Sequence, residues 1–69
     1  MSYITYTTQS GSRYVYDPGA HRIKRLESED VWQNISEWND PIVGQRMFLQ
    51  FGDNSKFQIT TPVVRIEAR

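Results

Sequence analysis

The chain contains no cysteine, a single histidine and no long hydrophobic run. Without cysteine it has no disulfide, no thiolate nucleophile and no cysteine-ligated zinc site, and one histidine is too few for a histidine-built metal site. No window approaches the roughly 18 apolar residues of a membrane-spanning helix, and the first residues lack the basic and apolar regions of a signal peptide. We therefore expect a soluble cytoplasmic protein with no cofactor, no metal and no membrane association.

Net charge is also absent, because eight acidic side chains balance eight basic ones. This removes the strongest compositional sign of a nucleic-acid-binding domain, since such domains are usually clearly basic. The charges are nevertheless segregated, with basic residues before position 26 and acidic residues from 27 to 40. Either the two groups neutralise each other within the fold, or they form oppositely charged patches that steer partners and promote self-association.

Candidate catalytic groups are few. His21 is the one imidazole base, and it follows a turn rather than standing beside an evident nucleophile, so a turn or surface role fits it better. Glu29 and Asp30 are adjacent, and adjacent side chains on a helix do not face each other as a catalytic pair would. We therefore predict that the protein is not an enzyme.

A length of 69 residues allows one domain, residues 1–69, with a thin core. Three segments are rich in β-branched or aromatic residues, or alternate between apolar and charged residues, and each predicts a strand: residues 3–8, 13–17 and 21–26. Gly11 in the first turn is expected to take a positive φ, and Pro18-Gly19 predicts a type II second turn. After residue 44, segments 45–51 and 56–60 predict a hairpin, and Pro62, which lacks an N–H, predicts a last edge strand over 61–69.

The segment between the third and fourth strands changes period. Val31, Ile35 and Trp38 recur at spacings of four and three, which is typical of an amphipathic helix, and Ser28 is placed to cap it. A helix over 29–38 that docks its tryptophans on the sheet is therefore expected. The predicted fold class is α+β: a small antiparallel sheet or partly open barrel of five to six strands with one short helix between strands 3 and 4.

The leading functional prediction is a non-enzymatic protein–protein interaction module. Two tryptophans beside an acidic helix face and an extra apolar group on the fourth strand suit a protein partner, because aromatic residues dominate binding energy at many interfaces. The partner is either another protein or a second copy, and a homodimer would supplement the thin core. The predicted partner-binding residues are Trp32, Trp38, Phe48, Glu29 and Glu37.

The alternative is a small nucleic-acid-binding domain that uses a basic strand surface. Exposed aromatic rings stack on bases while cations hold phosphates. The zero net charge and the acidic segment oppose this reading, because their field repels a polyanion. The residues of this alternative surface are Arg13, Tyr14, Tyr16, Arg22, Lys24 and Arg25.

The segments SGSRYVYD, HRIKRL and TTPVVRIE together resemble small accessory proteins of uncharacterised activity that are encoded by bacteriophages of actinobacteria. The similarity spans both flanks of the chain but not the tryptophan-containing middle. It implies action in the cytoplasm of an infected bacterial host, by binding and modulating a host protein, and it transfers no catalytic residue. A minor structural protein of the virion is a further alternative.

Overall fold

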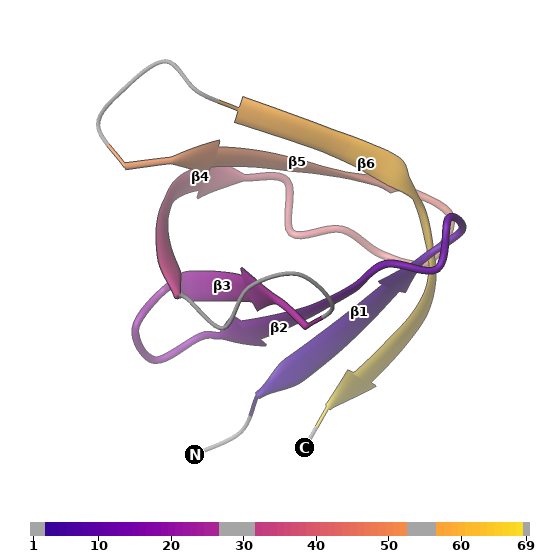
Figure 1. Cartoon of the computed structure of the whole chain (residues 1–69), viewed down its shortest axis with the longest axis horizontal. Helices are drawn as coiled ribbons and strands as arrows, with labels where there is room; N and C mark the ends of the chain where they lie inside the picture. Colours follow the sequence, from indigo (N-terminus) through magenta and orange to yellow (C-terminus); the bar gives the residue numbers. More distant parts are fainter. Residues whose placement is uncertain (1–2, 27–31, 53–56, 69) are drawn as a thin grey trace.

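Six antiparallel strands form a closed barrel in the computed structural model, which describes residues 3–26, 32–52 and 57–68 (Figure 1). Each strand pairs with its neighbour in sequence, and the last strand pairs with the first. None of the described residues forms a helix that could cross a membrane. The strands are β1 (Ile4–Thr8), β2 (Arg13–Asp17), β3 (Arg22–Arg25), β4 (Gln33–Trp38), β5 (Arg46–Phe51) and β6 (Phe57–Ala68).

The barrel closes through β6, which is long enough to bend across two neighbours (Figure 1). Its first half pairs with β5 up to Pro62, and its second half pairs with β1 from Val63 to Ala68. Pro62 lies where β6 changes partner, and its carbonyl accepts a hydrogen bond from the Gln9 N–H at 2.8 Å. The edge position predicted for the strand over 61–69 is therefore wrong, because Val63 to Ala68 pair with β1 and close the barrel.

The predicted helix is also wrong, because residues 33–38 form strand β4. Ile35 pairs with Phe51 and Glu37 pairs with Gln50, so Ser36 is an extra residue in a β-bulge. The bulge turns both Ile35 and Trp38 toward the interior at a spacing of three, which a helix also produces. Residues 27–31, with the predicted cap and Glu29, lie outside the described residues. The part of the chain that the structure describes is thus all-β rather than α+β, and the barrel is closed rather than partly open.

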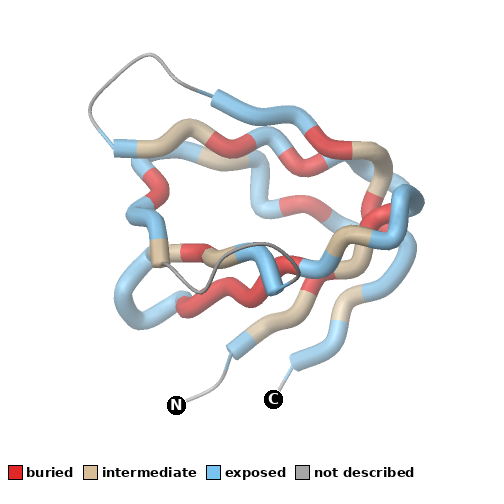
Figure 2. The backbone as a smooth tube through the Cα atoms, in the orientation of Figure 1, coloured by how far each residue is buried: buried red, intermediate tan, exposed pale blue. Residues whose placement is uncertain are grey.

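All six strands contribute side chains to the core, and the buried residues are the red segments of the backbone tube in Figure 2. Met47, Leu49 and Val63 are completely buried. Two of the core tyrosines keep their hydroxyl groups at polar partners: Tyr14 accepts a hydrogen bond from Gln58 Nε2 at 3.2 Å, and the Tyr16 hydroxyl is hydrogen-bonded to His21 Nδ1. The core residues are Tyr6, Tyr14, Tyr16, Ile23, Ile35, Met47, Leu49 and Val63.

The turns of the N-terminal meander differ in how well they were predicted. Gly11 takes a positive φ of 94°, which confirms its expected role. In the second turn the left-handed residue is His21, with φ 51°, and not Gly19, so the type II turn is wrong. The Asp17 carboxylate shapes this turn by accepting hydrogen bonds from the N–H groups of Gly19 at 3.0 Å and Ala20 at 3.4 Å.

Candidate functional site

In the first half of β6 the apolar side chains point outward and the polar side chains lie on the opposite side of the strand. Phe57 and Ile59 point outward and are 60% and 55% exposed. Gln58 pairs with the buried Leu49 and donates a hydrogen bond to the Tyr14 hydroxyl at 3.2 Å, so it lies on the same side of the sheet as Leu49, although it is itself exposed. Thr60 is 8% exposed, and its hydroxyl accepts a hydrogen bond from the Met47 N–H at 3.1 Å. A barrel strand that faced only water would carry the opposite pattern, with apolar residues inside and polar residues outside.

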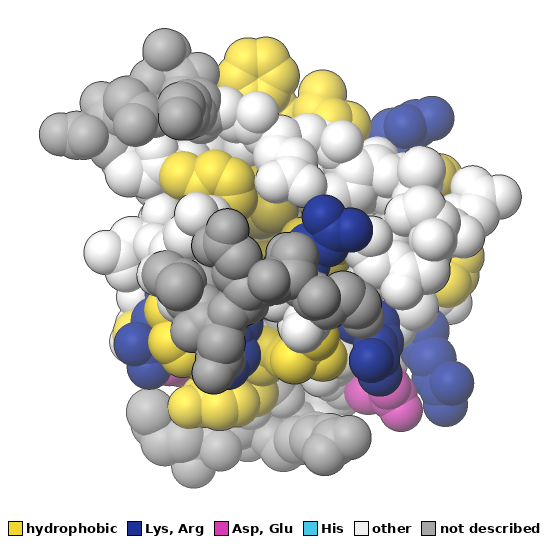
Figure 3. Space-filling view, in the orientation of Figure 1, with side chains coloured by type: hydrophobic (Ala, Val, Ile, Leu, Met, Phe, Trp, Pro, Cys, Tyr) yellow, Lys and Arg dark blue, Asp and Glu magenta, His cyan; other side chains and the backbone are white. Residues whose placement is uncertain are grey.

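Phe48 on β5 extends this apolar surface. It pairs with Ile59, and its ring centroid lies 5.5 Å from that of Phe57. Phe48 is 37% exposed while its neighbours Met47 and Leu49 are fully buried, which confirms the predicted alternation along this strand. We call Phe48, Phe57 and Ile59 the β5–β6 face. Hydrophobic side chains appear over the upper strands in the space-filling view (Figure 3).

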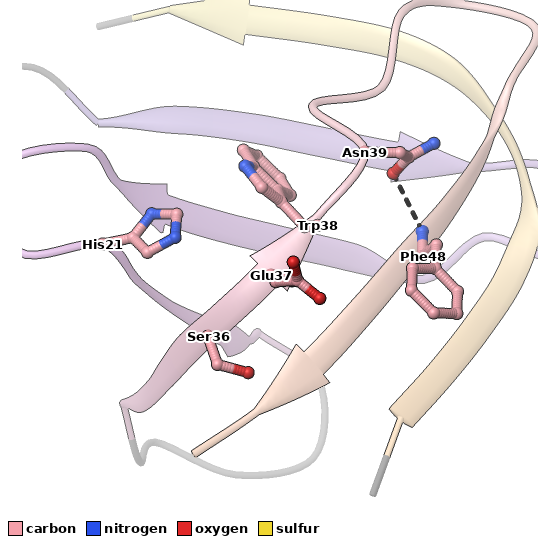
Figure 4. A pocket seen from close by; sticks show the side chains of 6 residues that line it. All are labelled: His21, Ser36, Glu37, Trp38, Asn39 and Phe48. Carbon is pink, nitrogen blue, oxygen red and sulfur yellow. Dashed lines mark hydrogen bonds between the residues drawn. The ribbon is translucent and has the colours of Figure 1, made fainter. Parts of the chain in front are cut away.

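A shallow hollow of about 480 Å³ borders this face at Phe48 (Figure 4). Its polar side chains hold β4 and β5 together. Asn39 accepts a hydrogen bond from the Phe48 N–H at 3.0 Å and donates one to the Arg46 carbonyl at 2.8 Å. The Ser36 hydroxyl donates to the Gln50 carbonyl at 3.0 Å. The hollow is lined by His21, Ser36, Glu37, Trp38, Asn39 and Phe48.

The inner wall of the hollow is an aromatic stack. Trp38 packs against Tyr16 with ring centroids 4.3 Å apart and meets Tyr6 edge-on at 5.6 Å. The Tyr16 hydroxyl and His21 Nδ1 are hydrogen-bonded at 2.8 Å. Burial, with the nearby Asp40 carboxylate and Tyr16 as smaller causes, raises the pKa of Tyr6 to about 12. Burial and the Asp40 and Asp17 carboxylates also raise the pKa of Tyr16, so both phenols stay neutral and the wall stays apolar at physiological pH.

Two charged residues stand at opposite margins of the β5–β6 face. Glu37 and Arg46 are the charged side chains of β4, β5 and residues 57–62, and both are exposed. Glu37 pairs with Gln50, two residues beyond Phe48, whereas Arg46 lies two residues before it. Arg46 donates a hydrogen bond to the Thr60 carbonyl at 3.3 Å, which places its side chain beside β6.

The structure divides the predicted partner-binding residues. Phe48 and Glu37 lie together, but Trp38 is half-buried against the core and offers only its margin to the hollow. Trp32 lies over β3 instead, with the Arg22 guanidinium 4.5 Å and the Lys24 ammonium 5.0 Å from its ring. Glu29 lies outside the described residues.

Phe57 and Ile59 were missed by the sequence reasoning. Their alternation with polar residues predicts a strand with one apolar side, but alternation alone does not tell which side faces the interior. The pairing of Leu49 with Gln58 decides it, and the sequence pattern does not contain this register.

The alternative nucleic-acid surface is not assembled as predicted. Tyr14 and Tyr16 are 5% and 8% exposed and belong to the core, so they are not available to stack on bases. The four basic residues of that surface all interact with other parts of the chain. Arg22 Nε contacts the Asp17 carboxylate at 3.1 Å, and the Arg25 guanidinium donates a hydrogen bond to Ser12 Oγ at 2.9 Å. The Lys24 ammonium lies over the Trp32 ring, and Arg13 also has an interaction partner.

Within the described ranges no cluster of three or more His, Asp or Glu residues is placed to hold a metal ion. No protein-family model, curated protein or solved structure matches this chain. The resemblance to phage-encoded proteins therefore stays a prediction, and the geometry of the β5–β6 face is the basis for any functional proposal.

Proposed function

We propose that the protein is a non-enzymatic interaction module that binds a protein partner through the β5–β6 face. The exposure of Phe57 and Ile59 beside Phe48 is the observation that supports this most strongly. The polar residues Gln58 and Thr60 lie on the opposite side of β6, where Thr60 is buried and Gln58 is exposed. Apolar side chains gain free energy when a partner covers them, at about 25 cal/mol for each Å² of apolar surface removed from water.

The chemistry of the face favours a protein over a polyanion or a small molecule. Its three central residues are apolar and pack side by side, and the adjoining hollow is shallow. Three of the polar residues of that hollow, Ser36, Asn39 and His21, already bond to the backbone or to Tyr16, so they hold the strands in place. An apolar centre with a polar rim is the usual anatomy of a protein–protein interface.

Site-specific photocrosslinking tests this proposal. A photoreactive phenylalanine analogue replaces Phe57 in the full chain, and the chain is expressed in the cells from which the protein comes. Leu26 is the matched control position, because it is an exposed apolar residue, 44% exposed, that follows β3 and is not part of the β5–β6 face.

We expect ultraviolet light to produce a defined covalent protein adduct from position 57 and little or none from position 26. A second copy of the chain counts as a partner in this experiment. The proposal is refuted if position 57 gives no adduct, or if the two positions give the same set of adducts in the same yield.

A further inference from the structure

We infer that the partner on the β5–β6 face is a second copy of this chain, in an isologous two-fold dimer. This inference rests on the proposed function and adds the identity of the partner and the register of the contact. A two-fold interface needs a surface that is complementary to itself, so that each contact occurs twice. The β5–β6 face has this property in both its apolar and its charged residues.

The apolar part is self-complementary because of strand register. Ile59 pairs with Phe48, and Phe57 pairs with Gln50, one step further along the same edge. A two-fold axis in the plane of the face, running across the strands through the Phe48–Ile59 pair, brings Phe48 onto Phe48 of the second copy and Ile59 onto Ile59 of the second copy. Phe57, which is level with Gln50, then lies against the second copy at the level of Arg46, on the other side of the axis.

The charged margins follow the same symmetry. Glu37 lies on the Gln50 side of Phe48 and Arg46 lies on its other side, so the axis brings each carboxylate toward a guanidinium of the second copy. Two symmetric ion pairs result, at the rim where such pairs set register. The chain has zero formal net charge, so two copies do not repel each other overall.

The size of the face indicates a weak dimer. Phe48, Phe57 and Ile59 are 37%, 60% and 55% exposed, which amounts to roughly 300 Å² of apolar surface if a fully exposed ring offers about 200 Å². With a polar rim of similar size, each copy buries about 600 Å², the lower end of specific interfaces. We therefore expect assembly in the micromolar range rather than the nanomolar range.

Sedimentation equilibrium of the purified full chain, from about 10 μM to about 1 mM, measures this assembly. Phe57→Ser is expected to raise the dissociation constant at least about ten-fold, whereas Leu26→Ser, the control, leaves it within about two-fold. Glu37→Arg and Arg46→Glu each place like charges together and weaken assembly by about five-fold or more. The double variant restores the ion pairs in reverse and returns assembly to within about three-fold of the wild type.

Restoration by the charge swap, in variants whose circular dichroism matches the wild type, supports the proposed dimer. The dimer is refuted if the chain stays at 8.1 kDa throughout the series, or if it assembles but Phe57→Ser and the charge reversals have no effect. A monomer that still gives a photoadduct with a different protein at position 57 overturns the dimer alone and leaves the interaction module in place. A monomer with no adduct at position 57 overturns both.

Discussion

Leu49 and Phe48 are neighbours on β5, and the barrel gives them opposite environments. Leu49 is fully buried in the core, while Phe48 is 37% exposed on the β5–β6 face. A Leu→Ala change at a buried site costs about 2–5 kcal/mol, because apolar contacts are lost and a cavity remains. A chain of this length has a free energy of unfolding of roughly 3–10 kcal/mol, so Leu49→Ala removes about a fifth of it or more. Phe48→Ala removes a ring that is already partly in water and costs about 1 kcal/mol.

Urea unfolding monitored by tryptophan fluorescence measures this contrast, at a protein concentration of a few micromolar where assembly contributes little. With a slope near 1 kcal/mol per molar urea, Leu49→Ala lowers the midpoint by about 3 M and Phe48→Ala by about 1 M. Leu49→Met, which conserves volume, serves as the matched control and costs less than about 1.5 kcal/mol. Equal losses for Leu49→Ala and Phe48→Ala would refute the assignment of inner and outer faces on β5.

Three further changes probe other parts of the barrel. Burial raises the pKa of Tyr6 to about 12, above its value near 10 in the unfolded chain. The stability linked to this shift is therefore complete below pH 10 and is lost as the pH rises toward 12. Urea unfolding across this range shows the decline, and Tyr6→Phe flattens it. Trp38→Ala is expected to lower the free energy of unfolding by about 3 kcal/mol or more, because the ring packs on two core tyrosines. Trp32→Ala removes an outer ring that lies beside two cations and is expected to cost about 1 kcal/mol. Thermal unfolding of both variants compares the two losses, and a larger loss for Trp32→Ala would contradict these placements. Thr60→Val leaves the Met47 N–H without its acceptor and is expected to lower the free energy of unfolding by about 1–3 kcal/mol. Urea unfolding measures this loss, and an unchanged free energy would contradict the hydrogen bond.

The local β signals in the sequence predicted the strands well. The β-branched and aromatic composition, with turn residues between the segments, predicted strands over 3–8, 13–17, 21–26 and 45–51. The structure confirms strands there, with bounds of 4–8, 13–17, 22–25 and 46–51. The helix failed because a bulge at Ser36 spaces the inward residues Ile35 and Trp38 three apart. A bulged strand and one turn of helix share that spacing, so periodicity over so short a segment does not separate them.

Long-range pairing was the part that the sequence did not reveal. Pro62 predicts an edge strand when only its missing N–H is considered, yet its position at the bend of β6 lets the strand pass from β5 to β1. The candidate site shows the same limit. Phe48 and Glu37 were recognised by local pattern, but Phe57 and Ile59 join them only through the register of β5 with β6.

An isotope-filtered nuclear Overhauser experiment tests the two-fold dimer directly, on an equal mixture of labelled and unlabelled chain at about 1 mM, where a micromolar dimer is well populated. The dimer predicts intermolecular contacts between the Ile59 side chains of the two copies, with further contacts between the two Phe48 rings. An absence of intermolecular contacts, or contacts confined to the surface of β1–β3 around Trp32, would contradict it.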